Sequence, residues 1–337
     1  MNISKEKFQK PSYLKPLVLM SAMFLGSFTQ TTQAALSFTF NYTPSVDGHG
    51  FDDPTYGAAR QSALSNAASL LGNYFVNYTA NLTYDVVSYS ANDGTLASAG
   101  SGQYLVPGSF QPTVVQEKIL SNGGVDENAT AADGEINWNF NWNWGLTNAP
   151  SSSQYDFTST AIHELLHSFG FGSNVGAGGL GFALNALGTA DTWTTFDSFL
   201  TDSSGNKLIN SSGIFDATKV GALTAGTTNA AGVLFNGANA IAANGGQGIP
   251  IYSPNPFSAG SSIAHLDDKS SVTNTSIMNA AAHNLGLDVR TLGPIELGIL
   301  KDIGYVNVTA VPLPSAVWLM LSGIMAVLGF QRKRKTL

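Results

Sequence analysis

Alternating hydrophobic and polar positions predict strands in the first part of the chain. The clearest alternation covers residues 136–144, where four asparagines share one face and large apolar side chains share the other. Because successive side chains of a strand point to opposite faces, such a run predicts a strand with one buried face. Weaker runs of the same kind predict further strands over residues 36–42, 83–89 and 102–106.

Apolar residues at helical spacing predict the helices. The most informative helix begins after Asp156, whose side chain can cap it, and ends at Phe169 before Gly170. Residues 171–260 are rich in Gly, Ala and Asn with little periodicity, so they predict a long irregular insert with a strand near 194–200. The other predicted helices cover residues 54–75, 112–120, 214–223, 238–244 and 294–303.

This order of elements predicts an α+β fold, in which a mixed sheet packs on the helix at 156–169 and a C-terminal helix follows the insert. No internal repeat or linker divides residues 35–310, so they are predicted to form one domain. A chain of that length is ample for a substantial hydrophobic core.

The first 34 residues predict a secretory signal. Four lysines precede an apolar run over residues 16–28, and small residues at 32–34 offer a cleavage site before Ala35. A transmembrane anchor is the alternative, but the apolar run is short for a bilayer span. We therefore expect the domain to be exported.

The last residues, 311–337, have three parts in a fixed order. Val311-Pro312-Leu313-Pro314 is followed by an apolar run over 316–330 and a basic cluster over 332–335. This segment resembles the PEP-CTERM sorting tail of Gram-negative bacteria, with Leu313 where that family usually has an acidic residue. The resemblance implies export through the inner membrane, transient membrane association and recognition by an exosortase-type sorting enzyme. Tail removal would then leave the domain at the cell surface or outside the cell. The alternative is a plain anchor held by its basic flank.

Composition and charge narrow the classes of partner. Only 11% of residues are charged, and the absence of cysteine excludes disulfides, thiol nucleophiles and Cys-ligated zinc. Setting aside residues 1–34 and 311–337 leaves 7 basic and 21 acidic residues, a net charge of −14. Such a surface repels nucleic acid and anionic lipid, so we expect neither as a partner.

The candidate chemistry lies on the helix at 156–169, which contains the motif H-E-x-x-H. His163 and His167 are four residues apart and therefore share one helix face, so both rings can reach one metal ion. The apolar side chains on the opposite stripe can bury against the sheet; they are Ile162, Leu165, Leu166 and Phe169. In this motif the glutamate, Glu164, is the catalytic base.

The third protein ligand that zinc requires is not fixed by local spacing. The compact metzincin motif has a histidine three residues after its glycine, and Ser173, a poor zinc ligand, stands there after Gly170. The candidates elsewhere are His49, His265, His283 and, as in thermolysin-like enzymes, the carboxylate of Glu296.

A family resemblance favours one of these candidates. The H-E-x-x-H helix, Gly170 and Phe171, a long insert, then His265 and the turn Ser276-Ile277-Met278, resemble the leishmanolysin-like branch of the metzincins over roughly residues 135–305. The resemblance implies one zinc per chain held by His163, His167 and His265, with His283 as the lesser alternative. It also implies an apolar floor at Met278. Ala280 departs from metzincins that have a tyrosine there, so no ligand or oxyanion donor carries over from that position.

These observations together predict an exported zinc-dependent endopeptidase, in which Glu164 activates a zinc-bound water that hydrolyses peptide bonds of a protein or peptide substrate. The rival is a non-catalytic surface or biofilm-matrix protein on a protease-like fold, and a zinc hydrolase of polysaccharide is a third reading. By resemblance, the strand at 136–144 binds substrate by strand addition, or else fills the core as an inner strand. The acidic pairs 52–53 and 267–268 could hold calcium, although loop capping is the simpler role.

Overall fold

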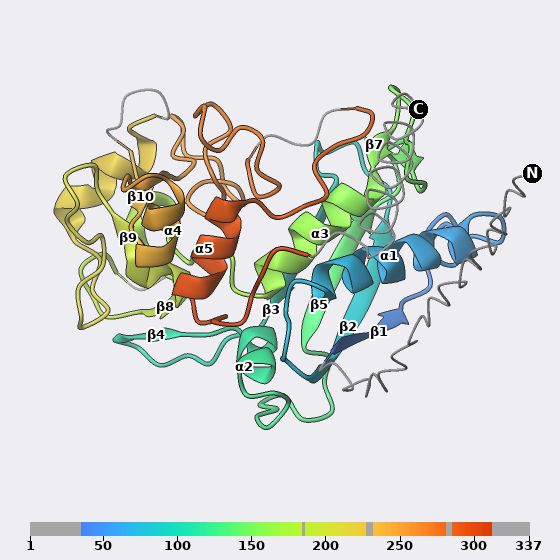
Figure 1. Ribbon diagram of the computed structural model, residues 1–337, viewed down its shortest axis with the longest axis horizontal. Helices are drawn as coiled ribbons and strands as arrows, with labels where there is room; N and C mark the ends of the chain where they lie inside the picture. The colour runs from blue at the N-terminus through green and yellow to red at the C-terminus, as the bar shows by residue number, and fades with distance from the viewer. Residues whose placement is uncertain (1–34, 184–185, 227–231, 281–284, 312–337) are drawn as a thin grey trace, which may run out of the picture. The chain divides into compact units, whose positions relative to one another are not determined.

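Four strands form the main sheet in a computed structural model that describes residues 35–183, 186–226, 232–280 and 285–311 (Figure 1). Their order across the sheet is β1-β2-β5-β3. The first three run parallel, whereas β3 pairs antiparallel with β5, so the sheet is mixed and the α+β prediction is confirmed. Their bounds are Leu36–Tyr42 (β1), Ala80–Tyr89 (β2), Ala97–Ser101 (β3) and Gly134–Asn139 (β5).

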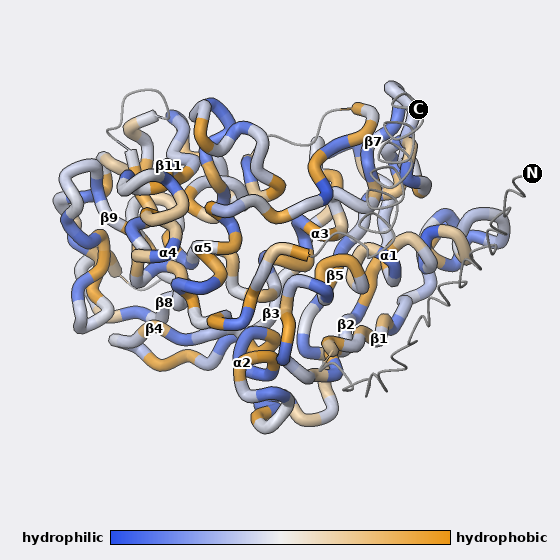
Figure 2. Tube along the Cα trace, in the orientation of Figure 1, coloured by the Kyte–Doolittle hydropathy of each residue, from blue (hydrophilic) through white to orange (hydrophobic). Residues whose placement is uncertain are grey.

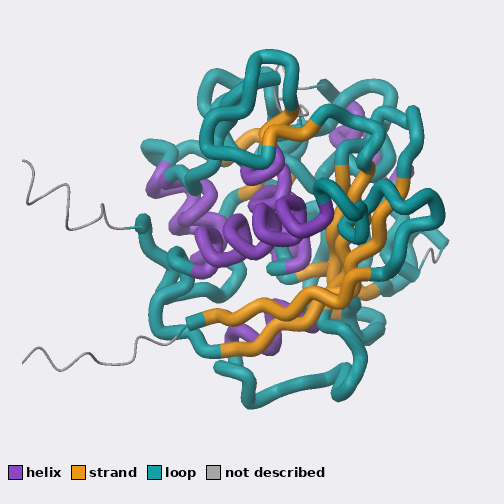
Figure 3. Tube along the Cα trace, turned by 90° about the vertical axis from the view of Figure 1, so that its right-hand side faces the viewer, coloured by secondary structure: helices purple, strands orange, loops and turns teal. Residues whose placement is uncertain are grey.

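One face of this sheet is buried under two helices, α1 (Gly57–Gly72) and α3 (Phe157–Ser168), as Figure 3 shows. Burial alternates along β1 and β2, because every second side chain points toward these helices. Figure 2 shows the hydrophobic positions that recur along these strands. The large buried side chains under the helices include Tyr84, Val86, Ile136 and Trp138. Burial of this apolar surface is what holds the helices on the sheet.

The chain after α3 is built from short pieces. One short sheet pairs β8 (Thr192–Thr194) with β4 (Ser109–Gln111), which precedes α3, and another has the order β11-β10-β9. Helix α4 packs on α5, where Gly298 lets the Ala240 backbone approach closely. The remaining bounds are β6 Trp144–Gly145, β7 Tyr155–Asp156, β9 Leu200–Thr201, β10 Leu234–Phe235, β11 Ile249–Pro250, α2 Val114–Leu120, α4 Ala238–Ala243 and α5 Pro294–Asp302. Three 3-10 helices cover Ala177–Gly179, Phe196–Phe199 and Ala217–Thr224.

Most predicted elements are present, with shifted ends. The helices predicted at 54–75, 112–120, 156–169, 238–244 and 294–303 are confirmed as α1 to α5. Two predicted strands are wrong. Residues 102–106 are mostly loop beside the real strand β3, and 194–200 is mainly a 3-10 helix between β8 and β9. The helix predicted at 214–223 is a 3-10 helix at 217–224.

The described residues share one continuous hydrophobic cluster that runs from the sheet to α5. Across the described parts of the chain, no helix combines the length and the apolar character needed to cross a bilayer. The expected signal (residues 1–34), residues 312–337 of the expected tail and the candidate ligand His283 lie outside the described residues.

Candidate metal centre

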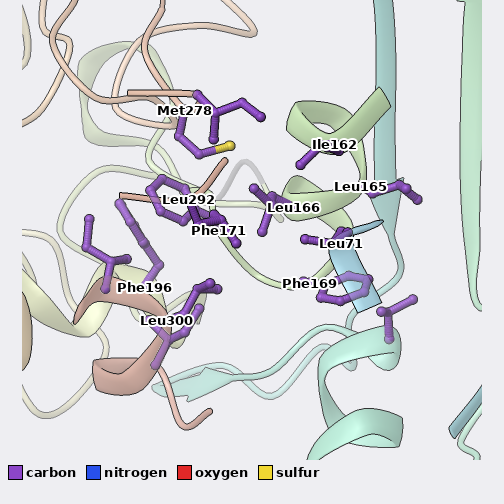
Figure 4. Close-up of a cluster of buried hydrophobic side chains, with 14 of the residues drawn as sticks. Leu71, Ile162, Leu165, Leu166, Phe169, Phe171, Phe196, Met278, Leu292 and Leu300 are labelled. Carbon is purple, nitrogen blue, oxygen red and sulfur yellow. The ribbon is translucent and has the colours of Figure 1, made fainter. Parts of the chain in front are cut away.

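Helix α3 places the first two histidines of the site. It begins where predicted, because the Asp156 side chain accepts the backbone N–H of Ser159 at 3.1 Å as an N-cap. Its apolar stripe is fully buried, as expected, and Figure 4 shows these side chains in one buried cluster with Met278 and Leu292; they are Ile162, Leu165, Leu166 and Phe169. The opposite stripe therefore turns His163 and His167 toward a cleft.

The turn after α3 orients the second histidine. Gly170 has a positive φ of 91°, and a Cβ there would lie 2.4 Å from the Gln116 side chain, so glycine is required. The turn brings the N–H of Phe171 back to the Leu166 carbonyl at 3.1 Å. The Phe171 carbonyl then accepts the Nδ1–H of His167 at 2.8 Å, which fixes the ring with Nε2 toward the cleft.

His265 reaches the site from the irregular part of the chain. Its neighbour Leu266 is fixed by two backbone bonds, in which its N–H donates to the Met278 carbonyl (2.8 Å) and its carbonyl accepts from Ala280 (3.1 Å). Two residues before His265, the buried Ile263 has a φ of 68°, which is an unfavourable conformation for a β-branched residue. Its N–H donates to Tyr252 at 2.8 Å, and tertiary contacts of this kind hold the strained segment in place.

The three histidines converge on one point. The Nε2–Nε2 distances are 3.0 Å between His163 and His265, 3.2 Å between His163 and His167, and 3.1 Å between His167 and His265. In each ring the other nitrogen, Nδ1, lies close to a backbone carbonyl oxygen. The distances are 2.7 Å from His163 to Ile277, 2.8 Å from His167 to Phe171 and 2.8 Å from His265 to Ser261. Since a carbonyl only accepts, each Nδ1 carries the proton, and each neutral ring presents a lone pair at Nε2.

This arrangement fits a metal ion. Three lone pairs that meet at about 3 Å repel one another, and a cation at about 2.0–2.1 Å from each nitrogen would relieve that repulsion. The carbonyl bonds to Nδ1 are the outer-shell contacts that metal-binding histidines usually have. The three side chains could therefore hold a metal ion.

Glu164 lies in the same cleft, between the histidines in sequence. Burial raises the pKa of its carboxyl to about 8, partly offset by the N–H of Ala99, which donates to Oε2 at 3.0 Å. Burial also lowers the pKa of His167, which favours the neutral ring that binds metals. A dication on the histidines would lower the pKa of Glu164, because positive charge favours the carboxylate.

The cleft has a volume of about 540 Å³ and two unlike walls. One wall is β3, and the other is formed by the segments around Ser261 and Asn279. Among the described residues that line it, Glu164 and the three histidines are the only ionisable side chains, and there is no other aromatic ring. The rest of the lining is small, with Gly, Ala, Ser and Thr most common.

Among the residues that the structure describes, the other candidate ligands do not join the cluster. The Ser173 hydroxyl donates to buried Asp197, and His49 is exposed and lies 3.7 Å from Asp53. The Glu296 carboxylate is buried but accepts the backbone N–H groups of Met278 (3.1 Å) and Gly293 (2.6 Å), and burial raises its pKa to about 7. Sequence alone had set Ser173 aside as a poor ligand, but it left His49 and Glu296 open, because both lie far from α3 along the chain.

The edge of the sheet beside the cleft is not the strand that the sequence indicated. Of the strand predicted at 136–144, only the residues up to Asn139 belong to β5, because the chain turns at 140–143. Strand β5 lies between β2 and β3 with Trp138 fully buried, so the proposed substrate role of this strand is wrong and the inner-strand alternative holds for β5. The edge strand is β3, which pattern analysis missed because Ala97-Ser98-Ala99-Gly100-Ser101 has no apolar alternation.

The acidic pairs offered as calcium sites have local partners. Asp52 accepts the backbone N–H of Ser45, and Asp53 accepts those of Thr55 and Tyr56. Asp267 accepts the N–H of Lys269 at 2.9 Å. These contacts match the simpler role of loop capping.

Comparison with known proteins assigns this chain to no family. No protein-family model matches the chain, and no curated protein matches it.

Proposed function

We propose that this protein is an exported zinc-dependent endopeptidase with a metzincin-like catalytic domain. The observation that carries the proposal is the convergence of three imidazole Nε2 atoms, from His163, His167 and His265, in the cleft that also holds Glu164. A buried set of three neutral imidazoles has no evident structural purpose without a cation, and an adjacent carboxylate is what metal-assisted hydrolysis requires.

The chemistry divides between the ion and the chain. When bound, zinc supplies a Lewis acid that acidifies water and polarises the carbonyl to be cleaved. Glu164 takes the proton of the attacking water and passes it to the leaving amine as general base and then acid. The Ala99 N–H, which donates to Glu164, holds the carboxylate in place for both transfers.

A peptide is the substrate class that the cleft favours. Strand β3 is the last strand of its sheet and lines the cleft, so an extended peptide can pair with its outer edge by strand addition. The Ala99 N–H at this edge points into the cleft, where Glu164 accepts it, so the edge lies beside the proposed catalytic carboxylate. Polysaccharide sites commonly use aromatic rings as stacking surfaces, and the described lining has none besides the three histidines.

Export and sorting belong to the same proposal. The leader pattern over residues 1–34 and the tail pattern over 311–337 support passage through the inner membrane of a Gram-negative bacterium. Processing by an exosortase-type enzyme, after transient association of the tail with the membrane, would leave the protease at the cell surface or outside the cell.

Metal analysis and a single substitution test the enzyme proposal. The purified, zinc-replete protein should contain about one zinc per chain. Glu164→Gln should keep that zinc but lose about 10²–10⁴-fold in kcat/KM on a casein-like substrate, because the general base is gone. Glu135→Gln, on the exposed face of the sheet, is the matched control and should cleave normally.

Clearly substoichiometric zinc would instead support the non-catalytic matrix protein. Full activity of Glu164→Gln would show that the assigned base is wrong.

A further inference from the structure

We propose that Glu296 is a positioning residue for the metal centre: its buried carboxylate holds the methionine turn, residues 276–279, and through that turn orients His163 and His265. The inference rests on the proposed metal site, and it assigns a task to a carboxylate that the proposed reaction does not use. Glu296 is only 1% exposed and lies in the first turn of α5.

The first link joins the carboxylate to His163 through one peptide group. Glu296 Oε1 accepts the N–H of Met278 at 3.1 Å. The carbonyl of that same peptide, Ile277 C=O, accepts the Nδ1–H of His163 at 2.7 Å. Hydrogen bonds in such a chain polarise one another, so the carboxylate strengthens the carbonyl as an acceptor and makes the ring more electron-rich.

The second link joins the same turn to His265. The Met278 carbonyl accepts the N–H of Leu266 at 2.8 Å, and the N–H of Ala280 donates to the Leu266 carbonyl at 3.1 Å. Leu266 follows His265 directly, so the turn fixes the backbone next to the third histidine. One carboxylate therefore supports the contacts that set two of the three rings.

Helix capping alone does not account for this placement. Glu296 Oε2 accepts the N–H of Gly293 at 2.6 Å as part of a capping box, which an exposed glutamate could do equally well. Burying a carboxylate is costly unless several donors compensate it. Here the second oxygen reaches out of the helix to the methionine turn, which gives the burial a role at the metal centre.

The same helix offers a matched control. Asp302, at the other end of α5, accepts the backbone N–H groups of Asn239 and Ala240, each at 2.9 Å. In both Glu296→Gln and Asp302→Asn an amide replaces a carboxylate, and each of these carboxylates hydrogen-bonds α5 to another segment. Only the first of these carboxylates contacts the methionine turn.

The experiment measures metal affinity by chelator competition, in full-length protein and at a temperature where circular dichroism shows every variant folded. We expect Glu296→Gln to raise the zinc Kd by about 10-fold, the lower end of the effect of losing an outer-shell partner, because Glu296 acts on His163 through one peptide group. Asp302→Asn should change the Kd less than about twofold. The visible spectrum of the cobalt-substituted protein should shift in Glu296→Gln and stay constant in Asp302→Asn.

Equal zinc Kd values and equal cobalt spectra for the two variants would overturn the inference and leave the proposed protease intact. If the wild-type protein binds no metal, both the inference about Glu296 and the proposed zinc protease are wrong. If Glu296→Gln does not fold, Glu296→Asp keeps the charge but is one methylene too short to bridge Gly293 and Met278. It should then raise the Kd severalfold, and an unchanged Kd in that variant would overturn the inference as well.

Discussion

The two parts of this molecule build the same site by different means. Residues 35–170 contain the main sheet and the two longest helices, α1 and α3, and α3 delivers both His163 and His167. Residues 171–311 contain strands of only two or three residues, yet they deliver His265, which is 98 positions beyond His167. In Figure 1 most of these later segments lie to the left of α3, whereas the chain after α5 returns to the end of α1, where Val308 pairs with Phe75.

The difference shows where the precision of each half comes from. On α3 the helical repeat alone puts residues four apart on one face. In the later part, the position of His265 depends on single backbone bonds from Leu266 to Met278 and Ala280 and on the burial of the turn they belong to. An irregular segment can therefore position a side chain as accurately as a helix does when backbone hydrogen bonds hold it in place. Its position then depends on the segments that it bonds to.

The largest expected effect tests whether the two parts are one folding unit. Phe169, whose ring lies 5.0 Å from that of Phe75, and Phe235, 4.8 Å from Phe196, are both fully buried in the shared hydrophobic cluster. Because the cluster is continuous, Phe169→Ala and Phe235→Ala should each lower the unfolding free energy by about 3–5 kcal/mol within a single transition. Urea unfolding followed by circular dichroism and tryptophan fluorescence measures this.

Phe235→Ala could instead show a separate transition at lower urea concentration, while the unfolding midpoint of the part that contains the sheet stays unchanged. That result would show that the irregular part unfolds on its own.

The next effect concerns the ligand that the irregular part supplies. His265→Ala should weaken zinc binding by at least about 100-fold, more than the loss of an outer-shell contact, because one of three protein ligands is missing. Chelator competition gives the Kd. His49→Ala, which removes an exposed histidine outside the cluster, is the control and should bind zinc as the wild type does.

Wild-type affinity in His265→Ala would mean that the third ligand is another residue, and His283→Ala would be the next variant to measure.

The smallest effect lies inside the irregular part. Buried Asp197 accepts the N–H groups of Asn174 (3.0 Å) and Thr194 (2.8 Å), and burial raises its pKa from 3.8 to about 6. The folded state thus binds more protons than the unfolded state between these values, so the stability that this group contributes is present below pH 4 and lost as the pH rises through 6. Relative to Asp197→Asn, the wild type should lose about 2 kcal/mol of unfolding free energy between pH 4 and pH 7.

Urea unfolding at several pH values tests this slope, and Asp216→Asn is the control. The exposed Asp216 has a lowered pKa, mainly because the Thr218 hydroxyl donates to it, so its contribution to stability should change with pH in the opposite direction. A pH difference that Asp197→Asn leaves unchanged would place the proton uptake elsewhere.

Local signals predicted the regular part of the fold well. The alternation over 36–42 and the Asp156 cap with the Gly170 stop correspond to β1 and α3 within one or two residues. The sequence did not predict β3, because its small side chains show no hydrophobic alternation. Pairing with β5 makes this segment a strand, and it lines the cleft. It also gave 136–144 a choice between two roles that only the order of strands in the sheet resolves.

The sequence by itself determined the H-E-x-x-H helix and the residue types available for a metal site, because helix geometry and side-chain chemistry act over a few residues. The tertiary structure decided which distant histidine joins that pair, which strand borders the cleft, and that the Glu296 carboxylate bonds to the methionine turn instead of joining the histidines. The physical reason is range. A helix fixes the distance between residues four apart, whereas the approach of residues about a hundred positions apart is set by the burial and backbone hydrogen bonds of everything between them.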